Sequence, residues 1–183
     1  MVGRGCADIG WSNRLGWYEG FRLLVAVNPV GVVTGLGFCG ASCTDQQAAE
    51  TFFAVRHRPE AALASVGRAS LGPYVTDKGF EGAENHERWL GLYGAQVIHS
   101  PKRNSLRPWP KQLRRWLAGI RQIIVESVYD KLINTFGLHR ERPHEMAGLR
   151  ARLAARVALH NFCIWLNEQL GRPRLAFADL LQW

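Results

Sequence analysis

The sequence has few cysteines, no long uncharged apolar run and no apolar leader, and each absence excludes a class of protein. Four cysteines in 183 residues are too few and too scattered for a disulfide scaffold, and no paired Cys or His motif accompanies them to bind zinc. A membrane span needs about 18 consecutive apolar residues, and no such run exists. Arg4, Asp8 and Arg14 interrupt the first residues, so we expect no secretory signal and a cytoplasmic location.

Positive charge is abundant but confined to one segment. Residues 100–156 hold 13 Lys or Arg and four acidic residues, a net +9, whereas the rest of the chain carries −1. A field of this sign attracts polyanions, of which nucleic acid is the commonest in a cytoplasm, although a solvated surface is the alternative. The basic residues alternate with Trp109, Trp116 and Ile120 and form no polybasic tail, so we expect no membrane partner.

Strand and helix patterns alternate along the first hundred residues. Turn signals, caps and apolar spacing predict the strands Phe21–Asn28, Val32–Cys39, Leu71–Thr76 and Ala95–Ser100 and the helices Asp45–His57 and Glu84–Tyr93. A hairpin followed by strands that alternate with helices implies an α/β layer with a mixed sheet.

Helical spacing dominates the second half of the chain. Apolar residues recur every three or four positions from Pro110 to about Phe136, with Gly119 bending or dividing that helix, and again from about Glu145 to Leu170. At roughly 100–200 residues per domain the chain is expected to form a single domain, 1–183, in which about 145–183 is a C-terminal helix and tail.

Asp77 and Glu126 are the candidate site residues. Asp77 follows a short strand, at the end where open α/β sheets place ligands, and glycines follow it; a simple turn aspartate is the alternative. Glu126 lies in a polar stripe on an apolar helix, which is equally typical of a solvent-facing side. If the two carboxylates converge, they form an oxygen site for a hard divalent cation. The histidines have no consistent ligand spacing, and His160 is expected to be a satisfied core residue.

Several segments together resemble bacterial insertion-sequence transposases of the DDE class. The segments are GWYEGFRLLVAVNPVGVVTGLGFCGAS, YVTDKGFEG, WLGLYGAQVIHSPKR, LRRWLAGIRQIIVESVYDKLINTFGL and ARLAARVALHNFCIWLN. In their order they resemble the hairpin after the first catalytic strand, the second-aspartate region and the segment next to it, the helix that carries Arg, Glu and Lys, and the C-terminal helix with its Leu-His-Asn run. The resemblance covers nearly the whole chain.

The resemblance implies an RNase H-like fold and phosphoryl transfer on DNA that depends on Mg²⁺ or Mn²⁺. Asp77 and Glu126 would be the second and third metal-binding carboxylates. The residues that would contact DNA are Lys102, Arg103, Lys111, Arg114, Arg115, Arg121 and Lys131, although the family commonly spaces the Arg and Lys of its motif differently around the Glu. The implied partners are double-stranded DNA, at element ends and target, and a second copy of the chain or a full-length transposase, in a nucleoid-associated location.

The family's first aspartate has no clear counterpart. The residues before the hairpin contain only Asp8, beside glycines and in no strand-like run, so we expect the first central strand and its metal ligand to be absent. The sheet should then show a gap or rearranged pairing, and the chain alone should be impaired in catalysis. The alternatives are a non-catalytic DNA-binding protein that regulates or inhibits transposition, and a basic interaction protein without nucleic acid.

Overall fold

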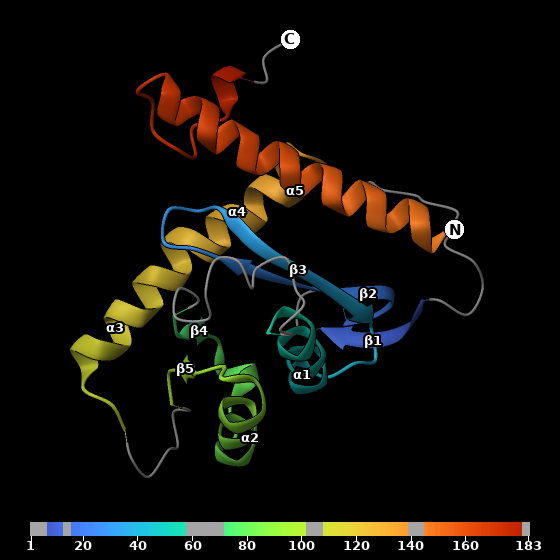
Figure 1. Cartoon of the computed structure of the whole chain (residues 1–183), viewed down its shortest axis with the longest axis vertical. Coiled ribbons are helices and arrows are strands. Elements are labelled where there is room, and N and C mark those ends of the chain that lie inside the picture. Colours follow the sequence, from blue (N-terminus) through green and yellow to red (C-terminus); the bar gives the residue numbers. More distant parts are fainter. Residues whose placement is uncertain (1–6, 13–15, 58–71, 102–107, 139–144, 181–183) are drawn as a thin grey trace. The chain divides into compact units, whose positions relative to one another are not determined.

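The computed structural model describes residues 7–12, 16–57, 72–101, 108–138 and 145–180. By its internal contacts the chain divides into two compact units: the first contains Met1–Ser42 and Gln122–Trp183, and the second is the continuous stretch Cys43–Arg121. Helices and strands follow one another in the mixed α/β order shown by the labels of Figure 1. No described helix has both the length and the hydropathy needed to cross a membrane.

An antiparallel sheet in the order β1-β2-β3 forms the base of the first unit. Its strands are β1 (Asp8–Ser12), β2 (Gly16–Val27) and β3 (Val33–Gly40). The turn between β2 and β3 is closed by Asn28, whose Oδ1 accepts from Val30 N at 3.1 Å and from Val32 N at 2.9 Å. Gly31 completes this turn with a φ of 92°, a conformation that favours glycine.

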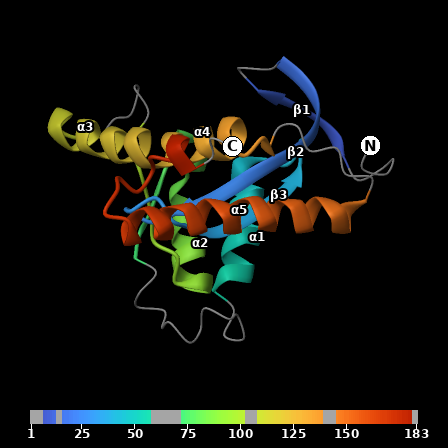
Figure 2. The same cartoon turned by 90° about the horizontal axis from the view of Figure 1, so that it is seen from above.

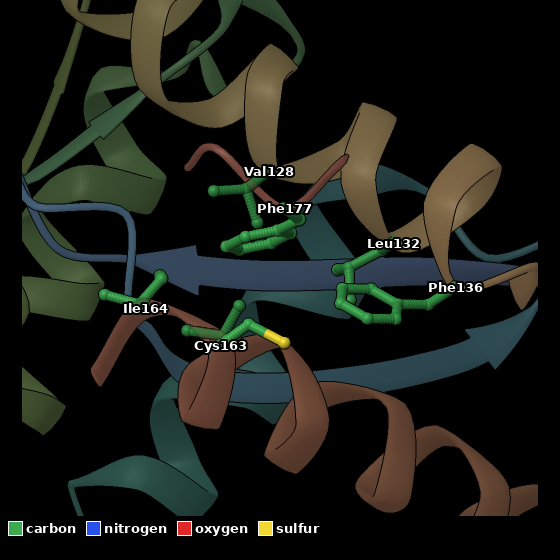
Figure 3. Close-up of a cluster of buried hydrophobic side chains, with 7 residues drawn as sticks. Val128, Leu132, Phe136, Cys163, Ile164 and Phe177 are labelled. Carbon is green, nitrogen blue, oxygen red and sulfur yellow. The ribbon is translucent and has the colours of Figure 1, made fainter. Parts of the chain in front are cut away.

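The helix α5 (Met146–Gln169) packs on this hairpin. Figure 2 shows it running beside β2 and β3. Asn161 attaches the helix to the sheet, since its Nδ2 donates to Val33 O and its Oδ1 accepts from Val33 N, each at 2.9 Å. Next to it, the Nε2 of the fully buried His160 bonds Gly31 O at 3.0 Å. The apolar core beneath the helix, shown in Figure 3, consists of Val33, Val128, Leu132, Phe136, Cys163, Ile164 and Phe177.

The second unit packs two helices on a parallel strand pair. Up to residue 99 its elements are α1 (Asp45–Arg56), β4 (Tyr74–Thr76), the 3-10 turn η3 (Lys78–Phe80), α2 (Ala83–Tyr93) and β5 (Val97–His99), with β4 parallel to β5. Thr44 caps α1 with a complete capping box, and Gly94 ends α2 in the left-handed conformation. Trp89 is fully buried at the centre of its core, with Ala49, Phe53 and Ala95.

The helical stretch after Pro110 is not uniformly α-helical. It consists of α3 (Lys111–Ile120), the π turn η4 (Arg121–Glu126), α4 (Ser127–Asp130) and a second π turn, η5 (Lys131–Thr135). The α-helical geometry ends at Ile120, one residue after Gly119, where the sequence predicts that the helix bends or divides, and the helix type changes at Arg121. The chain then closes with the 3-10 turn η7 (Ala178–Leu180), after α5.

The prediction of an α/β chain is confirmed, whereas its RNase H-like form stays a prediction. Among the described residues, antiparallel and parallel pairing occur in two separate sheets. One expectation is wrong: Asp8 does lie in a strand, since it begins β1 and pairs with Gly20. The strand was missed because its residues, DIGWS, include a glycine and lack a run of β-branched side chains.

Candidate metal and nucleic-acid site

Asp77 lies at the carboxyl end of β4, as the sequence predicted. It is exposed and caps η3, with its Oδ1 accepting from Gly79 N at 2.8 Å. Since β4 and β5 are parallel, their carboxyl ends meet at this edge. A turn aspartate would make the same cap, so the cap alone assigns Asp77 no chemical role.

A second carboxylate accompanies Asp77 in the second unit. A Cβ on Gly79 would collide with the Asp45 carboxylate and would lie 3.1 Å from Asp77 Oδ1, so both carboxylates converge on this glycine. Carboxylate oxygens are the ligands that hard cations such as Mg²⁺ prefer, and in donor type this pair fits such an ion. No cluster of three or more metal-binding side chains occurs in the part of the chain that the structure describes.

The loop that carries Asp77 is held from both sides. Gln46 Nε2, on α1, donates to Glu81 O at 3.0 Å, and the ring Nε2 of His86, on α2, bonds Phe80 O at 2.7 Å. Both contacts engage backbone atoms within five residues of Asp77. The carboxylate therefore projects from a fixed turn, as a ligand-binding group requires.

Glu50 is a carboxylate whose two oxygens both accept hydrogen bonds from side chains of the second unit. Its oxygens accept from Tyr93 Oη (2.6 Å), Trp89 Nε1 (2.6 Å) and the Arg88 guanidinium (2.8 and 3.1 Å). The Tyr93 hydroxyl, then the indole and the guanidinium, hold the pKa of Glu50 below its usual value. Glu50 thus joins α1 to α2 and is a structural residue, which its position in an ordinary amphipathic helix did not reveal.

Glu126 ends the π turn η4, in the first unit, and is exposed. In a π turn the backbone bonds join residues five apart, so Arg121, at the start of η4, lies on the same face as Glu126. From α-helical spacing the sequence predicts a polar stripe of Arg115, Gly119, Gln122, Glu126 and Asp130, and the π turn adds Arg121 to the face of Glu126. Single π turns occur frequently at functional sites.

The predicted convergence of the two carboxylates stays a prediction. Asp77 belongs to the second unit and Glu126 to the first, and each unit is described by itself.

The predicted DNA-contacting residues fall into three groups. Lys111, Arg114 and Arg115 are exposed on α3, beside a Trp116 that is 61% exposed. Arg121 is exposed on η4, and Lys131, the first residue of η5, is half-buried. Lys102 and Arg103 lie outside the described residues. An exposed cationic helix next to a flat aromatic side chain suits phosphate contact combined with stacking.

Asp8 is engaged within the first unit. Its Oδ1 accepts from Ser42 N at 2.9 Å and its Oδ2 from Ser42 Oγ at 2.5 Å, and these bonds hold the Asp8 pKa below its usual value. A Cβ on Gly40 would lie only 2.5 Å from Oδ2, so the carboxylate is in close contact with the backbone after β3. This carboxylate ties β1 to the segment that follows β3.

Comparison with protein-family models, curated proteins and solved structures found no match for this chain.

Proposed function

We propose that this chain is an RNase H-like transposase domain of the DDE class, with a metal-dependent site for phosphoryl transfer on DNA. Asp77 carries the proposal: its exposed carboxylate stands at the carboxyl end of a parallel strand, on a turn fixed from two helices, and beside a second carboxylate. The order of hairpin, helix, strand, helix and strand also supports the proposal.

Each residue has a distinct role in this proposal. Asp77 and Glu126 would hold Mg²⁺ or Mn²⁺ through oxygen, and Asp45, which faces the same glycine as Asp77, would add negative charge beside Asp77. When bound, the cation stabilises negative charge on the attacking and leaving oxygens of phosphoryl transfer. Arg121 and Lys131 would position DNA phosphates, Arg121 from the face that carries Glu126 and Lys131 from the first residue of η5.

The same proposal holds that a single chain transfers phosphoryl groups poorly. A complete DDE site also needs the family's first aspartate, and the candidate for that position, Asp8, has both oxygens hydrogen-bonded to Ser42. Cleavage of DNA carrying terminal repeats, measured with Mg²⁺ and with Mn²⁺, should stay near background. Robust cleavage that is lost in Asp77→Asn would overturn this part of the proposal.

Direct Mn²⁺ binding tests the metal site independently of cleavage. Asp77→Asn, Asp45→Asn and Glu126→Gln should each weaken Mn²⁺ binding, measured by titration calorimetry. Asp130→Asn is the matched control, because Asp130 is an exposed carboxylate one helical turn after Glu126 and is not among the proposed metal ligands. If the three site variants bind Mn²⁺ as well as the control does, the metal site is refuted.

The second candidate is a DNA-binding protein without catalysis that regulates or inhibits transposition. It is favoured by the exposed cations of α3 together with the engagement of Asp8. Replacing Lys111, Arg114 or Arg115 by Gln should flatten the dependence of log K on log[salt] by about 0.9 per lost phosphate contact. If the α3 variants lose DNA affinity and the variants of Asp77, Asp45 and Glu126 bind DNA and Mn²⁺ normally, the chain is a non-catalytic DNA-binding protein.

A further inference from the structure

The outward side of α5 carries an apolar stripe that no described element covers. Its buried side, including Cys163 and Ile164, packs in the core of the first unit. At about 100° per residue the exposed residues of the opposite side fall within an arc of about 80°; they are Ala147, Ala151, Ala154, Ala158, Phe162, Trp165 and Gln169. A regular spacing of three or four residues gives a continuous seam along the helix.

Side-chain size is distributed unevenly along this seam. The half before Ala158 contains only alanines, whereas the half after it contains the two aromatic residues. Phe162 is 52% exposed and Trp165 53%, and their ring centroids lie 5.6 Å apart. Two large, solvent-exposed aromatic side chains next to a row of alanines are typical of an interaction surface.

We propose that this stripe pairs antiparallel with the same stripe of a second copy of the chain, across a two-fold axis near Ala158. Residues equally distant from Ala158 then face each other: Phe162 meets the second copy's Ala154, and Trp165 meets its Ala151. Every large side chain is opposed by an alanine, and each pairing occurs twice, as an isologous interface requires. Alanines also allow helices to approach to about 8 Å.

The charges beside the seam select the same orientation. Arg150 and Glu168 are exposed at the same angular position on α5, eighteen residues or five turns apart. In the antiparallel pair, Glu168 comes within two residues of the second copy's Arg150 along the axis. Glu168 also bonds Arg174 at 2.8 Å, which orients its carboxylate. A parallel pair would place alanine against alanine and would leave Glu168 and the second copy's Arg150 about 27 Å apart along the axis.

Concentration-dependent association tests the surface. In sedimentation experiments the full chain should form dimers, and Phe162→Ala or Trp165→Ala should weaken the dimer by about tenfold or more, as expected for buried aromatic anchors. Trp17→Ala is the matched control, because Trp17 is 74% exposed on β2 and far along the chain from α5. A chain that stays monomeric up to its solubility limit, or whose dimer is unaffected by both α5 changes, overturns the proposal.

Charge reversal and cross-linking test the orientation. Arg150→Glu and Glu168→Arg should each weaken the dimer, and the double variant should restore it. Ala158→Cys should form a disulfide across the axis, beyond any cross-linking by the native cysteines. Ala147→Cys should not, because the two positions would lie about 33 Å apart. Cross-linking at 147 but not at 158, or no restoration in the double variant, overturns the antiparallel pair.

Discussion

The two units solve the same problem, attaching helices to a small sheet, with different chemistry. In the first unit the partners are distant in sequence, and Asn161 and His160 of α5 bond backbone atoms of the hairpin. In the second unit the partners are near in sequence, and the carboxylate of Glu50 collects donors from α2 around the buried Trp89. The first unit therefore depends on contacts between segments distant in sequence, and the second on a half-buried charged residue that links its two helices α1 and α2.

The largest expected loss of stability follows from a change in the core of the second unit alone. Trp89→Ala should destabilise the second unit by about 3–5 kcal/mol, because it removes the fully buried centre of that core. Hydrogen exchange should show α1 and α2 losing protection while β2, β3 and α5 keep theirs. Trp116→Ala, which alters an exposed tryptophan, should leave both units unchanged. Equal loss of protection in both units after Trp89→Ala would show that they unfold together.

Glu50→Gln should cost the second unit about 1.5–3 kcal/mol near neutral pH, since hydrogen bonds to a charged group become bonds to a neutral one. Because folding lowers the pKa of Glu50, its contribution is present above its ordinary value of 4.5 and is lost as pH falls through the lower folded-state pKa. Urea denaturation followed through the buried Trp89 should show this loss in the native chain and not in the variant. If the free energy of unfolding has the same pH dependence in the native chain and in Glu50→Gln, Glu50 is not the group that titrates.

The smallest expected effect lies in the first unit, at a higher pH. Burial lowers the pKa of His160, which sits between Phe136 and Phe177 and bonds Gly31 O, below its ordinary value of 6.5. Below pH 6.5 the imidazole of His160 binds a proton in the unfolded chain but stays neutral in the folded unit. The free energy of unfolding therefore decreases as the pH is lowered from 6.5 towards the folded-state pKa. His160→Gln keeps a donor for Gly31 and should remove this dependence, measured by exchange protection of β3 between pH 5 and 7. Persistence of the dependence would assign it to another group.

Local signals predicted much of the fold. Thr44 and Gln47 form a capping box within four residues, and Gly94 ends α2 through its own backbone conformation. The start of α1 and the end of α2 could therefore be predicted from the sequence. The strand β1 was not, because its pairing with Gly16–Gly20 depends on the partner strand and not on the propensity of its own residues.

The candidate site was only partly predictable, for a similar reason. Asp77 follows from its place after a strand, but its neighbour Asp45 comes from the start of another element and meets it only at Gly79. The change to π turns was also invisible, since the apolar residues of that segment still recur at three- and four-residue steps.

The π turn η4 also sets the phase of the helical residues after it. A bond from residue i to i+5 encloses one residue more than an α-helical turn does. Rewinding these residues as α-helix without a deletion would rotate Val128, Leu132 and Phe136 by about 100°, whereas deleting one residue between Arg121 and Glu126 would let the turn close as α-helix and keep their phase. These side chains fill the core of the first unit, whereas η4 itself has no buried residue. The exposed turn η4 therefore determines which side chains of the following helical residues point into the core of the first unit.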